Sequence, residues 1–417
     1  MDTTQILPLL GGLSPQHFMR DYWQKKPLLI RQAIPGFQAL LDRSALFALA
    51  EQDEVESRLI TQADAGWKMK NGPFPRRALP PLKTPGWTLL VQGLDTHAAT
   101  VHDLLQQFRF VPDARLDDVM VSFATDGGGV GPHFDSYDVF LLQAHGQRRW
   151  RIGRQKDLTL VDGAPLKILA NFVPEQEFVL EPGDMLYLPP RYAHDGVAVG
   201  ECMTYSVGFR APKRAELVRE LMQRMAEEAE DAVGEALYSD PDQPATDTPG
   251  AIPAALQDFA QAALKELLDD PTALQCALGE VLTEPKAQVW FEASEPSEPL
   301  GAVTLDPRSR MFYDAQHIFI NGESFRAAGR DATLMRRLAD ARTLGPKIWP
   351  APAPMRAPWC CRGAPMAGCI PTERFHYGRP AAHPRGTPTP CRPVFGPGGV
   401  STDGAGCIGL RGARGVA

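Results

Sequence analysis

The chain has 417 residues, of which 44% are hydrophobic and 22% charged, so it belongs with ordinary soluble globular proteins and has room for two or three domains. Its formal net charge of −7 divides into −15 over residues 1–340 and +8 over residues 341–417, and the acidic part opposes broad contact with nucleic-acid phosphates. Because the N-terminus has no basic segment and no run of about 18 apolar residues occurs, we expect neither a signal peptide nor a membrane span, and therefore a cytoplasmic protein.

The first predicted elements are a helix and a strand. Ser14 and Pro15 are residue types that favour a helix N-cap and the first helical position. An apolar face at helical spacing follows, formed by Phe18, Tyr22 and Trp23. The run PLLIR then predicts a strand.

From about residue 116 to residue 210 the sequence consists of short β-like runs. They are separated by the turn sequences GGG, HGQ and PGD. The runs are DDVMVSFA, YDVFLLQA, RRWRIG, EFVLEPGDMLYLPP and MTYSVGFR. Many short strands at close spacing predict a sandwich or a small barrel.

A histidine and an aspartate stand two residues apart in GPHFDSYDVF. On an extended strand His133 and Asp135 point to one face, toward the barrel interior, where an unpaired polar group costs roughly 1–3 kcal/mol. His194, in LPPRYAHDGVAV, follows a later strand and supplies a third ligand. Two histidines and one carboxylate form the facial triad of non-haem Fe(II) oxygenases. A structural histidine beside a capping aspartate is the alternative.

Arg148 lies on the next predicted strand, fifteen residues after His133, in GQRRWRIG. An oxygenase that uses 2-oxoglutarate needs a cation for the distal carboxylate of this co-substrate, and an arginine fork pairs with a carboxylate bidentately. Trp150 shares the strand parity of Arg148 and is expected inside the barrel. Arg149 and Arg151 have the opposite parity and are expected outside.

Beyond residue 210 the pattern becomes helical. Apolar residues recur every three or four positions in RAELVRELMQRMAEEAEDAVGEAL, and two further amphipathic segments follow the linker SDPDQPATDTPGAIP. These apolar stripes either pack within the monomer or form a homodimer interface, because three short helices have little core of their own. A mixed β-plus-helix unit after residue 287 is winged-helix-like.

Residues 346–417 are predicted to be a disordered tail. This segment is rich in Pro, Gly and Arg, holds five of the seven cysteines and has no apolar periodicity. It therefore buries too little surface to offset an ordering cost of about 1–2 kcal/mol per residue. A nucleic-acid-binding arm, a zinc site and a frameshifted end of a longer helical domain are the alternatives. No paired CxxC spacing supports the zinc site.

Four segments together resemble the JmjC-type ribosomal oxygenases of bacteria, the cupin-like YcfD family, over about residues 10–340. The segments are FMRDYWQKKPLLIR, HFDSYDVFLLQAHGQRRWRIG, EPGDMLYLPPRYAHDGVAV and YSVGFRAP. The resemblance implies a mixed α+β fold, with a double-stranded β-helix (cupin/JmjC) catalytic domain, a helical dimerisation region and a C-terminal winged-helix-like unit. We expect these at residues 1–211, 212–286 and 287–345, followed by the tail at 346–417. Nothing beyond residue 344 resembles the end of a winged helix, which puts the completeness of that unit in doubt.

The resemblance also implies a site. Its metal ligands and catalytic residues are His133, Asp135 and His194, and its metal is Fe(II). Arg148 is the implied 2-oxoglutarate-binding arginine, and Ser206 matches a polar position near the co-substrate. Asp126, just before three glycines, matches an acidic group that receives the substrate guanidinium, although a simple turn residue is the alternative.

The implied activity is hydroxylation of an arginine in a large-subunit ribosomal protein. A hydroxylase acting on histidine and a metal-binding cupin without oxygenase activity are the alternatives. The expected partners are a basic ribosomal protein as substrate and a second copy of the chain. We expect no membrane contact, and the acidic charge of residues 1–340 argues against direct nucleic-acid binding and against a DNA-binding regulator.

Overall fold

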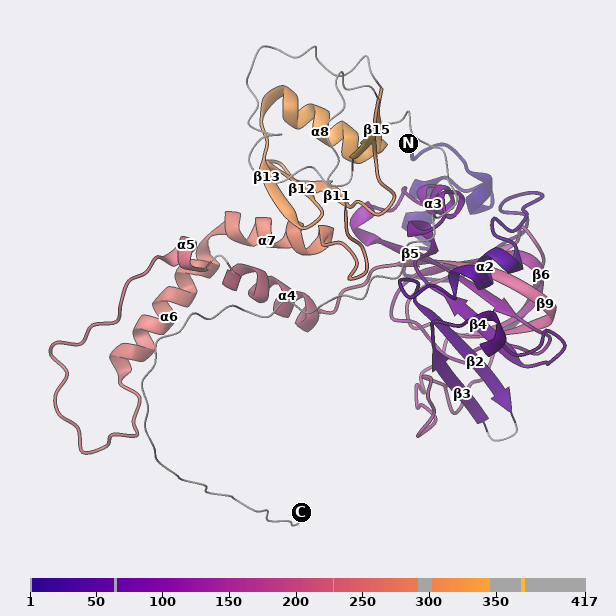
Figure 1. The fold of residues 1–417 in the computed structure, drawn as a ribbon, viewed down its shortest axis with the longest axis horizontal. Coiled ribbons are helices and arrows are strands. Elements are labelled where there is room, and N and C mark those ends of the chain that lie inside the picture. Colours follow the sequence, from indigo (N-terminus) through magenta and orange to yellow (C-terminus); the bar gives the residue numbers. More distant parts are fainter. Residues whose placement is uncertain (1, 64–65, 228, 292–301, 346–368, 372–417) are drawn as a thin grey trace, which may run out of the picture. The chain divides into compact units, whose positions relative to one another are not determined.

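A computed structural model gives the fold and describes residues 2–63, 66–227, 229–291, 302–345 and 369–371 (Figure 1). All of these residues belong to one compact unit, which spans Met1–Arg374. Within the described part of the chain, no helix is both long enough and apolar enough to cross a membrane.

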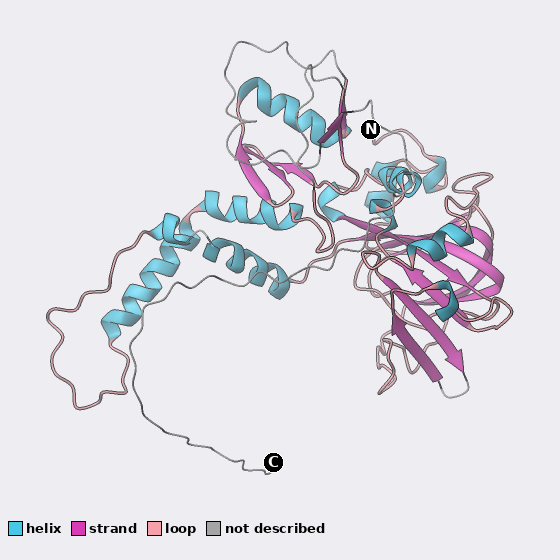
Figure 2. Ribbon diagram, viewed as in Figure 1, coloured by secondary structure: helices cyan, strands magenta, loops and turns pink. Residues whose placement is uncertain are grey.

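One antiparallel sheet of nine strands lies within the first 210 residues (Figure 2). The strands are β1 (Leu28–Ile30), β2 (Ser57–Ala63), β3 (Gly66–Asn71), β4 (Trp87–Val91), β5 (Leu116–Ala124), β6 (Val139–Gly153), β7 (Gln176–Leu180), β8 (Met185–Leu188) and β9 (Ala193–Phe209). Their order is β1-β8-β6-β9-β5-β4-β2-β3, and β7 pairs with β6 off this path. The predicted barrel-like sheet of many strands is therefore present.

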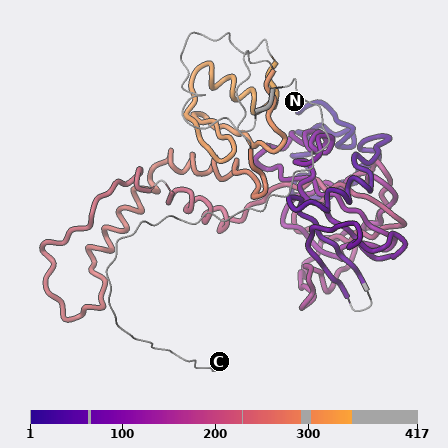
Figure 3. The backbone as a smooth tube through the Cα atoms, viewed as in Figure 1, coloured from indigo at the N-terminus to yellow at the C-terminus, as the bar shows by residue number. Residues whose placement is uncertain are grey.

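The long strands β6 and β9 pair from Val139 opposite Gly208 to Gly153 opposite Ala193. Figure 3 traces the backbone through these strands, and β9 also pairs with the earlier strand β5. On its other edge β6 pairs first with β8 and then with β7. The change occurs at an irregularity around Gly146, which has φ +60° and where a Cβ would collide with the Glu201 carbonyl oxygen. A bulge of this kind bends both strands and lets one sheet curve over itself.

The two faces of this sheet bury different side chains. One face packs against three helices, namely α1 (Pro15–Asp21), α2 (Arg43–Leu49) and α3 (Ala99–Gln106). Phe18, Phe47 and Phe140 belong to the large apolar cluster between these helices and the sheet. The opposite face holds a smaller cluster that includes Leu141 and Trp150. The candidate site lies on this second face, which we call the inner face.

Helices follow the sheet, as predicted. They are α4 (Arg214–Glu227), α5 (Ala229–Val233), α6 (Ala254–Asp269) and α7 (Pro271–Thr283). Their own buried core is small and is centred on Met225, Leu267 and Ala277. Many other apolar side chains of these helices are exposed: Val218, Leu256, Phe259, Leu264, Leu268, Leu274 and Leu278.

The last described region combines small sheets with one helix. Its elements are β10 (Val303–Leu305), β11 (Met311–Tyr313), β12 (His317–Ile320), β13 (Glu323–Arg326), α8 (Gly329–Ala341), β14 (Thr343–Leu344) and β15 (Cys369–Pro371). The strand β15 lies inside the segment predicted to be a disordered tail and pairs with β10. These three residues therefore depart from that prediction, and the rest of the segment lies outside the described residues.

Candidate metal centre

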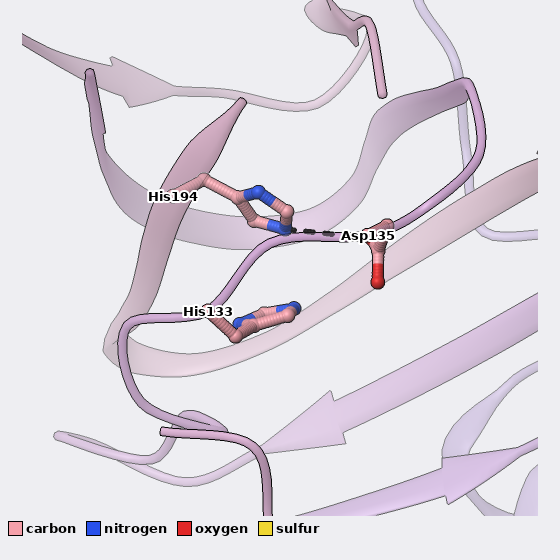
Figure 4. A group of neighbouring side chains, drawn as sticks. All are labelled: His133, Asp135 and His194. Atoms are coloured by element: carbon pink, nitrogen blue, oxygen red, sulfur yellow. Dashed lines mark ion pairs between the residues drawn. The ribbon is translucent and has the colours of Figure 1, made fainter. Parts of the chain in front are cut away.

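The three predicted metal ligands come together on the inner face of the sheet (Figure 4). One ligand atom from each of His133, Asp135 and His194 lies within 4.8 Å of the others. His194 is the second residue of β9, whereas His133 and Asp135 lie in the loop between β5 and β6. The prediction of a continuous strand through this pair was therefore wrong.

A local pairing nevertheless keeps His133 in a strand-like position. It forms an isolated β-bridge with His194, in which the two residues exchange backbone hydrogen bonds of 2.9 and 2.8 Å. The backbone N–H of Arg191 donates to the Asp135 carbonyl oxygen at 2.7 Å. The loop is thus attached to the start of β9, which brings all three side chains to one place.

Both imidazoles are oriented by the backbone. His133 Nδ1 lies 2.8 Å from the Gly131 carbonyl oxygen, and His194 Nδ1 lies 2.9 Å from the Tyr192 carbonyl oxygen. A carbonyl oxygen only accepts hydrogen bonds, so each Nδ1 carries the hydrogen and each Nε2 presents a lone pair. This is the arrangement that metal-binding histidines usually have.

The electrostatics favour the ligand form of His194. Its side chain is buried, and this burial, together with the neighbouring His133, lowers the pKa of His194 to about 4 in spite of the opposing effect of Asp135. His194 is therefore neutral near pH 7. Its Nε2 lies 3.7 Å from Asp135 Oδ2, the contact drawn as a dashed line in Figure 4, and a neutral imidazole leaves both atoms available as metal ligands.

Arg148 is a buried cation near this centre. It is 3% exposed, and its Nε and Nη2 atoms are buried with no hydrogen-bond partner in the described part of the chain. Its guanidinium carbon lies 5.8 Å from the Trp150 ring centroid, and the rings of Trp150 and His194 are also 5.8 Å apart. An unpaired buried charge is costly, so this position suits an anionic ligand beside the three metal-binding side chains.

The parity predicted for this strand is correct. Arg148 and Trp150 are buried on the inner face. Arg149 is exposed, and Arg151 forms an ion pair with Asp195.

The structure places Ser206 on β9 opposite Leu141 of β6, so its side chain shares the inner face with the Trp150 cluster. Asp126 is exposed, and its Oδ1 accepts a hydrogen bond of 2.8 Å from the backbone N–H of Gly200. This contact is typical of the turn residue that was the alternative for Asp126. The roles of both residues toward ligands remain predictions.

Trp67 is a neighbour of the site that sequence reasoning missed. A Cβ added at Gly131 would lie 2.8 Å from the Trp67 ring and 2.7 Å from Ile168, so both side chains pack on the residue that fixes the His133 ring. Gly131 also has φ +79°, a conformation that favours glycine. No motif in the sequence connects Trp67 with the ligands.

A cavity of about 670 Å³ lies next to this loop, with Tyr137 in its wall. Its charged lining is mainly acidic. The acidic residues are Asp117, Glu216, Glu220, Glu227 and Glu284, and the basic ones are Arg210 and Arg224.

Comparisons with known proteins agree with this geometry. Residues 103–217 match the family model of the JmjC domain, and residues 266–347 match that of the ROXA-like winged helix. The chain is 35% identical over 282 residues to the ribosomal protein uL16 3-hydroxylase of Escherichia coli (strain K12), covering 67% of this chain and 74% of the relative. It is 38% identical over 211 residues to a probable ribosomal oxygenase of Haemophilus influenzae, covering 49% and 52%.

Solved structures give the same result. The X-ray structure of E. coli ycfD matches with a TM-score of 0.68 and 31% identity, covering 79% of this chain and 90% of that one. YcfD in complex with cobalt and 2-oxoglutarate matches with a TM-score of 0.67 and 30% identity, covering 82% and 92%. The fold and the site define a JmjC-type oxygenase. Within this class, the chain belongs to the bacterial ribosomal oxygenase family.

Proposed function

We propose that this protein is an Fe(II)- and 2-oxoglutarate-dependent oxygenase that hydroxylates an arginine side chain of the large-subunit ribosomal protein uL16. The observation that carries the proposal is the set of two histidines and one aspartate beside a buried arginine without a partner. The chemistry that iron supplies in such a site is oxygen activation coupled to conversion of 2-oxoglutarate to succinate and carbon dioxide, with the second oxygen atom placed on a substrate carbon.

The side chains have separate tasks. His133, Asp135 and His194 would hold the metal, and two nitrogens with one carboxylate oxygen fit Fe(II) and leave room for other ligands. Arg148 would bind the far carboxylate of 2-oxoglutarate through its unpartnered Nε and Nη2. Trp150 packs between Arg148 and His194 and would exclude water from this space.

Ser206 and Asp126 would contact the co-substrate and the substrate. Ser206 would contact the co-substrate from the inner face of β9. Asp126 would receive the substrate guanidinium, which requires its carboxylate to bind substrate while one oxygen accepts from Gly200.

The choice of a basic protein substrate is supported by charge. The cavity beside Tyr137 has five acidic and two basic residues in its lining, and ribosomal proteins are rich in lysine and arginine. The relative from E. coli is named for hydroxylation of uL16. A histidine target is the alternative, because several animal relatives of lower identity are named histidyl-hydroxylases.

Mass spectrometry tests the proposal. The purified protein is incubated with Fe(II), 2-oxoglutarate and uL16, and fragmentation locates any added oxygen atom. We expect one added oxygen on an arginine, and none when the His133→Ala variant is used. Oxygen on a histidine, or on uL16 incubated without the enzyme, would contradict the arginine assignment.

We also propose that α4 to α7 form a homodimer interface, since these helices expose apolar side chains beyond what their small core buries. Static light scattering is expected to give twice the chain mass of 45.7 kDa for the wild type. The variant Leu264→Glu/Leu268→Glu should give a single chain mass, because it places two charges on the exposed stripe of α6.

The matched control for this prediction lies on the charged face of α6, which carries Asp258, Lys265 and Asp269. Lys265→Glu makes the same change of net charge at a side chain that is 77% exposed and should leave the dimer intact. A wild-type protein of one chain mass at micromolar concentration would overturn the dimer.

The domain limits are likewise a proposal, with the catalytic domain at 1–211 and the tail at 346–417. We place α7 with the winged-helix unit rather than with the preceding helices, since the Gly322 N–H donates to Thr283 Oγ1 at 3.1 Å and the family match starts at residue 266. A cytoplasmic location follows from a ribosomal substrate and is part of the same proposal.

A further inference from the structure

The hairpin of β2 and β3, with the segment that follows it, differs in charge from the acidic molecule around it. Residues 57–87 contain six basic residues and one acidic residue, within a region of net charge −15. Five of the basic side chains are exposed, and they lie within 16 residues of each other: Lys68, Lys70, Arg76, Arg77 and Lys83. We call these five residues the basic hairpin surface.

These cations have no acidic partner among the residues that the structure describes. In the described part of the chain, none of the five forms an ion pair, although four acidic residues precede β2 at positions 51–56. One of these acids, Glu56, forms an ion pair with Arg58 instead, with Oε1 and Nε 3.7 Å apart. Arg76 stacks on the Phe47 ring with its guanidinium carbon 5.2 Å from the centroid. The charge of the basic hairpin surface is thus available to an external anion.

The strand register places the two lysines on one face. Lys70 is opposite Leu59, and Lys68 is opposite Thr61. Directly opposed residues share a face, and Leu59 belongs to the same apolar cluster as Phe47, on which Arg76 stacks. Lys68, Lys70 and Arg76 therefore border one side of the hairpin.

The other side of the same strand leads to the metal centre. Trp67 and Lys68 have opposite parity, so the Trp67 side chain points to the inner face, where it packs on Gly131. Gly131 accepts the hydrogen bond that orients His133. A polymer bound at Lys68 and Lys70 would therefore lie across β3 from Trp67, on the opposite face of the sheet from the metal centre.

Protection of a sheet edge explains only part of this charge. The strand β3 is the last in the sheet and pairs only with β2, and lysines on such an edge prevent pairing with other chains. Arg76, Arg77 and Lys83 lie beyond β3, in and after a short 3-10 turn (Arg76–Ala78), and block no strand edge. Three of the five cations thus need another explanation.

We infer that the basic hairpin surface binds the phosphate backbone of RNA. Exposed lysines and arginines that are close together in the chain and have no ion pair among the described residues are what sequence-independent phosphate binding requires. Net charge alone argued against nucleic-acid contact, but it averages over the molecule and hides a local patch. The inference goes beyond the proposed function and rests on it in one respect only, since ribosomal proteins are bound to RNA when assembled.

Fluorescence anisotropy with a labelled 20-nucleotide RNA, in the absence of any protein substrate, tests this inference. The wild type is expected to bind with a Kd on the order of 10⁻⁶ to 10⁻⁴ M, as is typical of non-specific contact. If all five cations contact phosphates, the plot of log K against log salt has a slope of about −3.5 to −4.5. Lys68→Glu/Lys70→Glu should weaken binding at least about tenfold and flatten the slope by roughly 2.

The matched control makes the same change of net charge elsewhere. Arg330→Glu/Arg337→Glu alters two exposed bases of α8, outside the proposed dimer interface, and should change the Kd less than about threefold. Equal weakening by both variants, or no binding by the wild type, would overturn the inference. A change in oligomeric state caused by Lys68→Glu/Lys70→Glu alone would also overturn it. The basic hairpin surface would then bind the acidic surface of a second copy of the chain instead of RNA.

Failure of this inference is separable from failure of the proposed function. Succinate release with uL16 reports on the hydroxylase, and RNA anisotropy reports on the hairpin. Wild-type succinate release with no RNA binding rejects only the inference made here.

Discussion

Replacing His133 with alanine is expected to abolish both metal binding and 2-oxoglutarate turnover. The three ligand atoms lie within 4.8 Å of one another, so loss of one leaves a histidine and an aspartate that cannot define three positions around one ion. Loss of a residue that merely orients a ligand typically costs 10- to 100-fold, and loss of a ligand itself should cost more than about 100-fold. Bound iron measured by elemental analysis and succinate release measured by mass spectrometry report the two effects.

His145→Ala is the control for this experiment. This histidine is exposed at the irregular point of β6 and is not one of the three clustered ligands, so its loss should change neither readout. Thermal melting of both variants without metal shows whether each is folded. Near-wild-type succinate release by a folded His133→Ala variant would remove the oxygenase assignment.

Replacing Arg148 with methionine is expected to leave iron bound and to raise the KM for 2-oxoglutarate by about 30- to 1000-fold. This range corresponds to a loss of roughly 2–4 kcal/mol from charge-assisted hydrogen bonds to a carboxylate. The structure adds a second expectation. Because Nε and Nη2 of Arg148 are buried without partners, the unliganded variant should be at least as stable as the unliganded wild type.

Thermal melting separates these effects. Addition of 2-oxoglutarate with a metal that does not turn over should raise the wild-type melting temperature and leave that of Arg148→Met nearly unchanged. Arg149→Met, its exposed neighbour of opposite parity, should behave like the wild type in both assays. An unchanged KM in the Arg148 variant would show that another cation binds the co-substrate.

The sequence predicted the site well because its signals are local or depend on parity. The spacing of His133 and Asp135 places both side chains on one side of the backbone even though the segment is a loop rather than a strand. Arg148 and Trp150 could be assigned to the inner face from their position in a regular strand alone. The third ligand, His194, could be predicted because it directly follows another strand-like run in the same region.

Long-range packing could not be predicted in the same way. Trp67 reaches Gly131 because the sheet curves and β3 ends up beside the loop, which depends on strand order across residues 57–209. The strand at Cys369–Pro371 was missed because three residues amid Pro and Gly show no periodicity. Its pairing with β10 is visible only once that partner is in place.

The backbone bridge between His133 and His194 bears on how this centre tolerates sequence change. Two of the ligands are held at a fixed separation by main-chain hydrogen bonds, which every residue except proline can donate and accept. Substitutions in the surrounding apolar side chains can therefore accumulate during evolution without moving the two imidazoles apart. Substitutions in the loops and cavity walls can then change the substrate specificity while the geometry of the metal ligands stays the same.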